Sequence, residues 1–333
     1  MPRVRLDRWQ AGALAAATLC IACSASAQPA TWKPEKNIEI IVGLTAGSSQ
    51  DRSARAIQSI AQARALLNVT SSVVNRVGGA GNVAWSYLAQ HPGDAHWLQI
   101  ASPTILTGYI IGSAQFTYTD YSPLAMLGNQ YIGLAVRTES PIKSARDLVE
   151  RLRADPSSVS LATNSTGSYL HIVCALTARA AGLDPKKLKL VIFQGAELMT
   201  AALGGHVDVI STVTSNVLPH VQSGKLRLIG ISSARRLGGD LAQVPTLKEQ
   251  GVDAVLANWQ GVFGPPKLNA AQIAYWDGVF ARLVKTDEWR RDQEQNFWES
   301  EYLNAQDYAR FLKTDYDQAK AIFIELGLAR KDF

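Results

Sequence analysis

Short runs of β-branched and aliphatic residues alternate along this chain with longer stretches whose apolar positions recur at helical spacing. The first third predicts three strands and two helices, namely strands at 37–42, from Val73 and at 97–100, and helices from Gln50 to about Leu66 and through Trp85 to Leu88. Strands that alternate with helices favour a parallel sheet with crossover helices on both faces. The predicted fold class is therefore α/β.

The same alternation continues through the middle of the chain. It predicts further strands at 131–136, 159–163, 188–193, 207–210 and 226–232, and helices at 145–153, 169–181 and 197–203. From Ala270 onward the pattern is helical, with aromatic anchors such as Trp276 and Phe323. No repeat of fixed period interrupts the series, which is long enough for two lobes of ordinary domain size.

The N-terminus has the composition of a secretion signal. Arg3, Arg5 and Arg8 precede the short apolar run 11–22, and the small residues 25–27 suit a signal peptidase. A membrane-spanning helix would need about 20 apolar residues, so a retained anchor is the weaker alternative. We expect residues 1–27 to be a signal peptide cleaved near Ala27, and the mature protein to be periplasmic.

Composition and charge limit the class of protein to which the mature chain can belong. Removing the signal leaves about 306 residues (333 − 27) and, with three arginines and one aspartate gone, lowers the net charge from +5 to +3. The basic residues are scattered, which argues against nucleic acid as a partner. Cys174 is the one cysteine left, so no internal disulfide can form. Whether Cys23 in the signal is lipidated stays open, although no aliphatic residue stands three positions before it.

Two loops between a predicted strand and a predicted helix are rich in glycine and hydroxyl side chains. The first spans 43–51 and contains Gly47, Ser48 and Asp51; the second spans 164–168. Glycine lets the backbone approach a ligand, and the N–H groups and dipole of a helix start favour an anion. One such loop could be an ordinary capped turn. Two of them predict a cleft in which helix starts from both sides converge on an anionic ligand.

A third glycine-rich segment, 75–82, formally matches a dinucleotide fingerprint in the stretch Gly79 to Ala84. The acidic residue expected after the next strand is missing, because the stretch 97–102 ends in Ser102. Nicotinamide cofactors are also scarce outside the cytoplasm. We expect neither this cofactor nor any other.

Hydrolytic and metal chemistry find no support in the motifs. The sequence contains no G-x-S-x-G elbow, no H-E-x-x-H and no Walker loop. Its histidines lack metal-ligand spacing, so no metal site is predicted. Ser48 and Ser168 could be considered nucleophiles, but no base is identifiable beside them. The alternative to a binding protein is an exported enzyme acting on a small organic acid.

A series of segments in order along the chain resembles the periplasmic substrate-binding proteins of the tripartite tricarboxylate transporter family, the TctC-like or Bug-type receptors. These segments are 32–34, 40–51, 75–82, Gln194–Gly195, 202–208, 218–227, 244–249 with Gly251, and 259–265. The resemblance covers essentially the whole mature chain.

The resemblance implies a two-lobed type II periplasmic-binding-protein fold with a hinge and an interlobe ligand cleft. Lobe 1 would comprise 28–130 plus 255–333 and lobe 2 would comprise 131–254, joined near 128–131 and 252–259. It also implies a small carboxylate ligand, no catalysis, and permease subunits in the membrane as partners, with a sensor protein as another partner for the closed form. We expect a monomer.

The residues to which the family pattern and the loops assign ligand binding are Thr45, Ala46, Gly47, Ser48, Ser49, Asp51, Gly79, Asn82, Ser102, Asn164, Ser165, Thr166, Gly167, Ser168, Gln194 and Thr212.

The chain departs from the family pattern at several places. The usual paired glycine is Gly47-Ser48, the customary histidine after the second loop is Tyr169, and Val77 replaces a proline. The segment 211–215 lacks the acidic residue that many relatives carry there, which leaves Asp51 as the main candidate partner for a ligand ammonium. We therefore expect an acid without an amino group.

Overall fold

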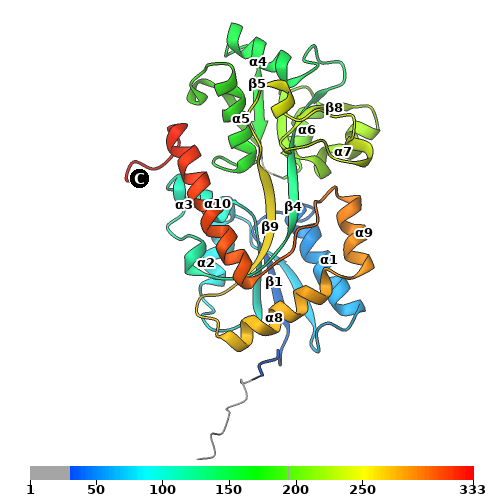
Figure 1. The fold of residues 1–333 in the computed structure, drawn as a ribbon, viewed down its shortest axis with the longest axis vertical. Helices are drawn as coiled ribbons and strands as arrows, with labels where there is room; N and C mark the ends of the chain where they lie inside the picture. Colours follow the sequence, from blue (N-terminus) through cyan, green and yellow to red (C-terminus); the bar gives the residue numbers. More distant parts are fainter. Residues whose placement is uncertain (1–30, 194) are drawn as a thin grey trace, which may run out of the picture. The chain divides into compact units, whose positions relative to one another are not determined.

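Two adjoining strands, β4 (Ser122–Arg137) and β9 (Ala257–Gly264), pass through the middle of the protein and connect its two lobes, as Figure 1 shows. The computed structural model describes residues 31–193 and 195–333 and places 32–333 in one unit. The predicted signal peptide lies outside the described residues. The fold is α/β and two-lobed, as expected.

The strands follow the order β2-β1-β3-β9-β4-β7-β5-β6, with β8 and β10 also pairing with β4. β1 runs parallel to β2 and β3 in the first lobe, and β5 runs parallel to β6 and β7 in the second. The remaining strand bounds are β1 Ile38–Val42, β2 Ser71–Asn75, β3 Trp97–Ala101, β5 Ser160–Thr163, β6 Lys189–Ile192, β7 Val209–Val213, β8 Leu226–Ile231 and β10 Leu303–Asn304.

In each lobe, helices cover both faces of the sheet. Their bounds are α1 Ser49–Ala63, α2 Asn82–Leu88, α3 Thr104–Ile110, α4 Ala145–Ala154, α5 Tyr169–Ala180, α6 Glu197–Leu203, α7 Thr214–Gln222, α8 Ala270–Leu283, α9 Asp287–Gln295 and α10 Ala305–Glu325, with short 3₁₀ turns η1 Gly79–Gly81, η2 Tyr118–Asp120, η3 Pro185–Lys187, η4 Gly239–Leu241 and η5 Lys248–Gln250. Side-chain caps begin several of them: Ser144 caps α4, and Asn269 caps α8 in a capping box with Gln272.

The crossing region differs most from the expected pattern. A strand at 131–136 was predicted, whereas β4 begins at Ser122 and is 16 residues long. Both β4 and β3 pair with β9 in the antiparallel direction, so the sheet is mixed rather than purely parallel. The reason is topological, because the chain crosses between the lobes once in each direction. The sequence alone also did not predict β9 or the short helix α3.

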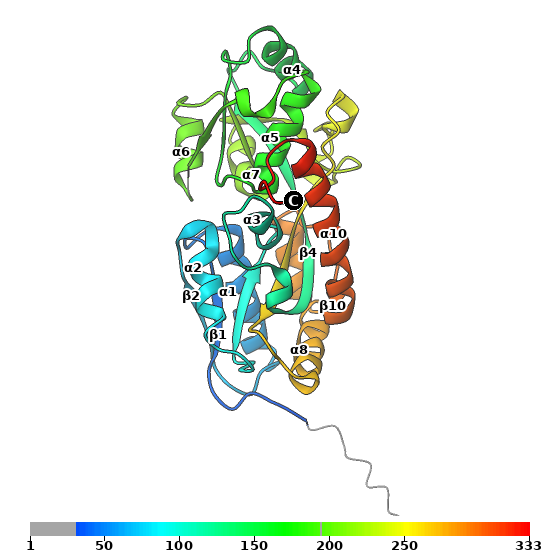
Figure 2. The same cartoon turned by 90° about the vertical axis from the view of Figure 1, so that its left-hand side faces the viewer.

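The C-terminal helix α10 packs on both lobes. Tyr308 and Leu312 lie in a core cluster with Trp259 and Phe263 of the first lobe, while Phe323 belongs to a cluster built around α5 of the second. Figures 1 and 2 show this helix, in red, alongside the crossing strands. The predicted assignment of 255–333 to lobe 1 stays a prediction.

Gly261 of β9 lies in close contact with Tyr308 of α10. A Cβ there would overlap the Tyr308 hydroxyl and lie 2.9 Å from the carbonyl oxygen of Ala125. We predict that Gly261→Ala lowers the free energy of unfolding by about 1–3 kcal/mol through overpacking, measured by chemical denaturation. Gly238→Ala is the control, because nothing lies within 4 Å of its Cβ position. Equal stability of the two variants would contradict this packing.

Candidate functional site

The first predicted loop is organised by the start of α1. The Ser48 hydroxyl caps the helix by accepting from the Asp51 amide at 3.3 Å, and the backbone turns at Gly47 with φ of +81°. The segment Thr45–Gly47 is exposed, and Ser48 and Ser49 are half-buried. A capped helix start with exposed residues before it is suited to an anion.

The buried carboxylate of Asp51 holds this loop together. It accepts from the Gly47 amide at 2.9 Å, from the Asn75 side chain at 3.0 Å, and from two nitrogens of Arg55 at 3.0 and 3.1 Å. Burial by itself raises the pKa of Asp51, but the hydrogen bonds from Arg55, Gly47 and Asn75 bring it below its ordinary value. These donors fill the carboxylate's acceptor positions. The geometry therefore gives Asp51 a role in shaping the loop, and contact with a ligand stays a prediction.

The second predicted loop has the same construction in the other lobe. Ser168 caps α5 by accepting from the His171 amide at 3.3 Å, and Gly167 turns the chain with φ of +76°. The Gly167 amide donates to Nδ1 of His171 at 3.0 Å, which requires that nitrogen to be unprotonated. Burial lowers the pKa of His171, consistent with a neutral ring. Asn164 and Ser165 are half-buried and Thr166 is exposed.

Each loop touches the opposite lobe. A Cβ on Gly195, in the loop after β6, would lie 2.9 Å from Oγ1 of Thr45, and a Cβ on Gly167 would overlap Ile111 at the end of α3. Arg52 of α1 donates to Oδ1 of Asn216 on α7 at 2.9 Å. The structure thus brings both predicted loops to the junction between the lobes.

The other predicted residues occupy different positions. Asn82 donates to the carbonyl of Ser113 at 2.8 Å, next to the exposed Gly79 in η1. Ser102 lies within 3.1 Å of the Thr104 hydroxyl just after β3, and Thr212 accepts from Asn216 at 3.4 Å. Gln194 lies outside the described residues.

Sequence reasoning missed a set of buried polar groups around the crossing strands. Each has at least one side-chain atom with no hydrogen-bond partner among residues 31–193 and 195–333. They are Gln130, Thr163, Thr214 and Gln260, together with the predicted Asn164. Buried polar atoms are nearly always bonded to protein, water or ligand. No local signal marked the two glutamines, because Gln130 lies outside the predicted strand 131–136 and β9 was not predicted. Arg52 was also missed.

Tyr169, the first residue of α5, has a buried partner. Its hydroxyl donates to Oδ1 of Asp315 on α10 at 2.8 Å, and the indole of Trp259 donates to Oδ2 at 2.6 Å. Burial raises the pKa of Asp315, an effect that the two hydrogen bonds oppose. This cluster fixes the start of α5 to β9 and α10, directly after the second loop.

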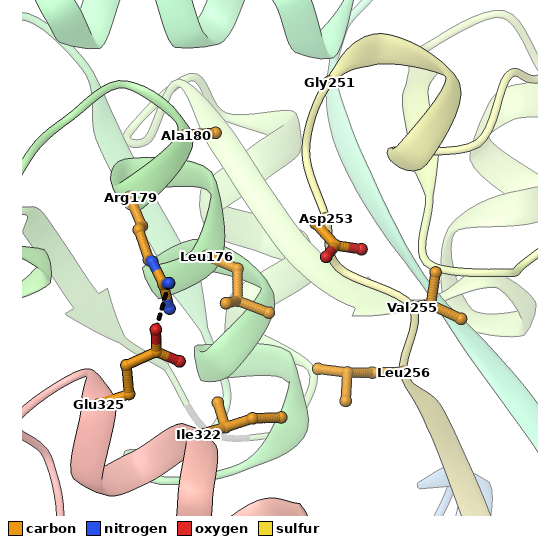
Figure 3. A pocket seen from close by; sticks show the side chains of 9 residues that line it. All are labelled: Leu176, Arg179, Ala180, Gly251, Asp253, Val255, Leu256, Ile322 and Glu325. Carbon is orange, nitrogen blue, oxygen red and sulfur yellow. Dashed lines mark hydrogen bonds and ion pairs between the residues drawn. The ribbon is translucent and has the colours of Figure 1, made fainter.

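Cavities are also present away from the two loops. One cavity of about 430 Å³ lies between the end of α5, the segment 251–256 and the end of α10. Figure 3 shows the side chains that line it, with Arg179 and Glu325 paired at one side. A second, of about 450 Å³, lies between α1 and α9. None of the predicted binding residues lines either cavity.

Among the residues that the structure describes, no cluster of three or more histidine, cysteine or acidic side chains could hold a metal ion. Within 31–193 and 195–333, no helix combines the length and apolar character needed to cross a membrane.

Comparison with known proteins identifies the family. Residues 54–328 match the model of the tripartite tricarboxylate transporter family receptor, TctC. The chain belongs to this family. It is 27% identical to a UPF0065 protein in the gbd 5′ region of Cupriavidus necator, over 96% of each chain. Membership makes it a solute-binding receptor rather than an enzyme, and the family implies a periplasmic location and a membrane transporter as partner.

Solved structures of low sequence identity share the fold. A protein of R. palustris, solved with adipate, superposes with a TM-score of 0.81 at 22% identity, covering 89% of this chain and 99% of that one. MatC from Rhodopseudomonas palustris, solved with malate, gives a TM-score of 0.75 at 20% identity, covering 87% and 99%.

The Asp51 network makes a testable contribution to stability. Because its pKa is lowered on folding, the stabilisation is present above the ordinary carboxyl pKa of about 3.9 and is lost as pH falls through the folded-state pKa. We predict that Asp51→Asn lowers the free energy of unfolding by roughly 1–3 kcal/mol at pH 7, and that its difference from the parent protein shrinks below pH 4. Urea denaturation across this pH range measures both.

The matched control is Asp147→Asn. Asp147 occupies the same position in α4, where it accepts from the Lys143 amide at 2.8 Å, but it is half-exposed. Its replacement should cost less. A loss at Asp51 that stays constant with pH would contradict the proposed charge network.

Proposed function

We propose that this receptor binds a small organic acid through a carboxylate held between the starts of α1 and α5, and delivers it to the membrane subunits of a tripartite tricarboxylate transporter. The observation that carries the proposal is the matched construction of the two loops. Each has a glycine at positive φ, followed at once by a serine that caps the helix, at Gly47-Ser48 and Gly167-Ser168. The two loops belong to opposite lobes and lie at their junction.

The electrostatics of the two loops favour a carboxylate. Helix starts present N–H groups and a partial positive charge, which bind an anion without a paired lysine or arginine. The two R. palustris structures were solved with adipate and malate, both carboxylates. Binding by closure of two lobes needs only complementary donors and a hinge. The binding residues are those predicted from the sequence, with Ser48 and Ser168 as the central pair.

The acid carries no amino group in this proposal. The carboxylate of Asp51 is already bonded to Gly47, Asn75 and Arg55, and the segment 211–215 contains no acidic residue. A ligand ammonium would therefore be buried without a counter-charge, which is costly.

The protein acts as a monomer, and its ligand-bound form presents a surface to the permease. Signalling to a sensor protein is the second candidate role.

Replacing each capping serine tests the placement of the site. We predict that Ser48→Leu and Ser168→Leu each weaken acid binding by on the order of a hundredfold, because the larger side chain fills the anion position. Native mass spectrometry of the copurified compound identifies the acid, and calorimetry measures the affinity. Ser144→Leu removes the equivalent cap of α4, so it should cost about 1 kcal/mol of stability and leave affinity unchanged. Full affinity in both site variants would refute this placement.

The absence of an amino group is tested with matched pairs of acids. We expect succinate to bind better than aspartate, and glutarate better than glutamate, because the amino acids bring an unpaired ammonium. Thermal-shift titration of the purified protein ranks each pair. Preference for the amino acid in either pair would contradict this part of the proposal.

A further inference from the structure

The two crossing strands present different chemistry on their two faces. In the antiparallel register Gly128 lies opposite Gln260, and Gln130 lies opposite Asn258. Since side chains alternate along a strand, Gln130 and Gln260 share one face, while Trp259 points to the other. The Trp259 face is covered by α10, where the indole donates to Asp315.

The glutamine face lies on the side of α1. Val262, two positions along from Gln260, packs in the same core cluster as Ile57 of α1. The pairing of β3 with β9 ends at Ala101 opposite Gly261, so Gln260 is the first residue of β9 past the end of β3. It therefore lies at the edge of the first-lobe sheet from which the first binding loop also emerges.

The start of α7 frames the same face from the second lobe. The Gln130 amide nitrogen lies 3.4 Å from the Ser215 hydroxyl, and the next residue, Asn216, accepts from Arg52 of α1. Gln130 and Gln260 thus lie on the crossing strands, with the first turns of α1 and α7 joined beside them.

Both glutamines are buried and have side-chain amide atoms without a hydrogen-bond partner in the described part of the chain. Gln130 and Gln260 are each 1% exposed. Within the described part of the chain, neither the nitrogen nor the oxygen of the Gln260 amide has a hydrogen-bond partner, and the Gln130 oxygen and the Thr214 hydroxyl lack one too. Burying an amide without a partner is unfavourable, so a group that bonds to them is expected in the working protein.

The unpartnered amide atoms determine which chemical group can hydrogen-bond to them. Gln260 offers an NH₂ donor group and an acceptor oxygen whichever way its amide is turned, and the Gln130 oxygen is a further acceptor. A carboxylate only accepts hydrogen bonds, so it would leave these acceptor oxygens facing a negative charge. A hydroxyl group both donates and accepts, and therefore matches the set.

We propose that Gln260, assisted by Gln130, forms a subsite for a hydroxyl group of the ligand, so that the bound acid is a hydroxycarboxylate. The inference rests on the proposed function, because the subsite lies beside the loop assigned to the carboxylate. It names the second polar group of the ligand and the residues that select it.

The first experiment separates a ligand subsite from a structural amide. In Gln260→Leu, removing the orphaned amide should leave the melting temperature of the unliganded protein unchanged or raised. Gln272→Leu is the matched control, because its buried amide donates to the Gly93 carbonyl at 2.8 Å and accepts from the Asn269 amide at 2.9 Å. That variant should melt several degrees lower and keep its affinity. A melting temperature for Gln260→Leu as low as that of Gln272→Leu would overturn the proposal.

The second experiment uses acids that differ by one hydroxyl: malate and succinate, 2-hydroxyglutarate and glutarate, 3-hydroxybutyrate and butyrate. Calorimetry should show the parent protein preferring the hydroxy member by at least about tenfold, with the preference lost in Gln260→Leu. Equal binding within every pair, or a preference that survives the substitution, would refute the hydroxyl subsite and leave the receptor proposal standing. If no acid in any pair binds, the proposed function itself fails and the subsite falls with it.

Discussion

The antiparallel pairing of β4 with β9 is the constraint on which the rest of this structure depends. These two strands carry the chain from one lobe to the other and back, and their register decides which residues face α10 and which face α1. Hydrogen-bonded strands have a side-chain period of two, so a shift by one residue would exchange Trp259 with Gln260. The tight approach of Gly261 to Tyr308 holds the register from one side.

The C-terminal helix extends this constraint to the second binding loop. Asp315 accepts from Trp259 on β9 and from Tyr169 at the start of α5. The residue after the cap Ser168 is therefore tied to the crossing strands. This gives Tyr169 a structural role, because its phenol reaches the buried carboxylate as a hydrogen-bond donor.

Charge at the proposed site is supplied mainly by backbone geometry. Asp51 at the start of α1 is paired with Arg55, and His171 in the first turn of α5 accepts from a backbone amide. Arg52 of α1 donates to the carbonyl of Gly47 and to Asn216. In the proposed site, the ligand would meet two helix starts with neutral hydroxyls and amides, with the Arg52 guanidinium beside the first. Such a site binds an anion by dipoles, and leaves selectivity among acids to neutral groups such as those of the crossing strands.

The sequence by itself determined the α/β class, the family and the two glycine–serine loops, because these depend on local signals. Strand runs are read from residues close in the chain, and a serine before a helix caps it whatever surrounds it. The bounds of α4, α5 and α6 agree with the expected ranges to within one residue. These properties can therefore be predicted without knowledge of the tertiary fold.

Only the tertiary structure decided the crossing region. The length of β4, the presence of β9 and the antiparallel register depend on strands more than 120 residues apart, which no local pattern encodes. The same holds for the hydrogen-bond partner of Tyr169, which lies 146 residues away, and for the hydrogen bond that Asn75 donates to Asp51. Nothing in the sequence distinguishes the glutamines at 130 and 260. They become candidate ligand contacts because the fold buries both on one face and leaves amide atoms available to a bound ligand.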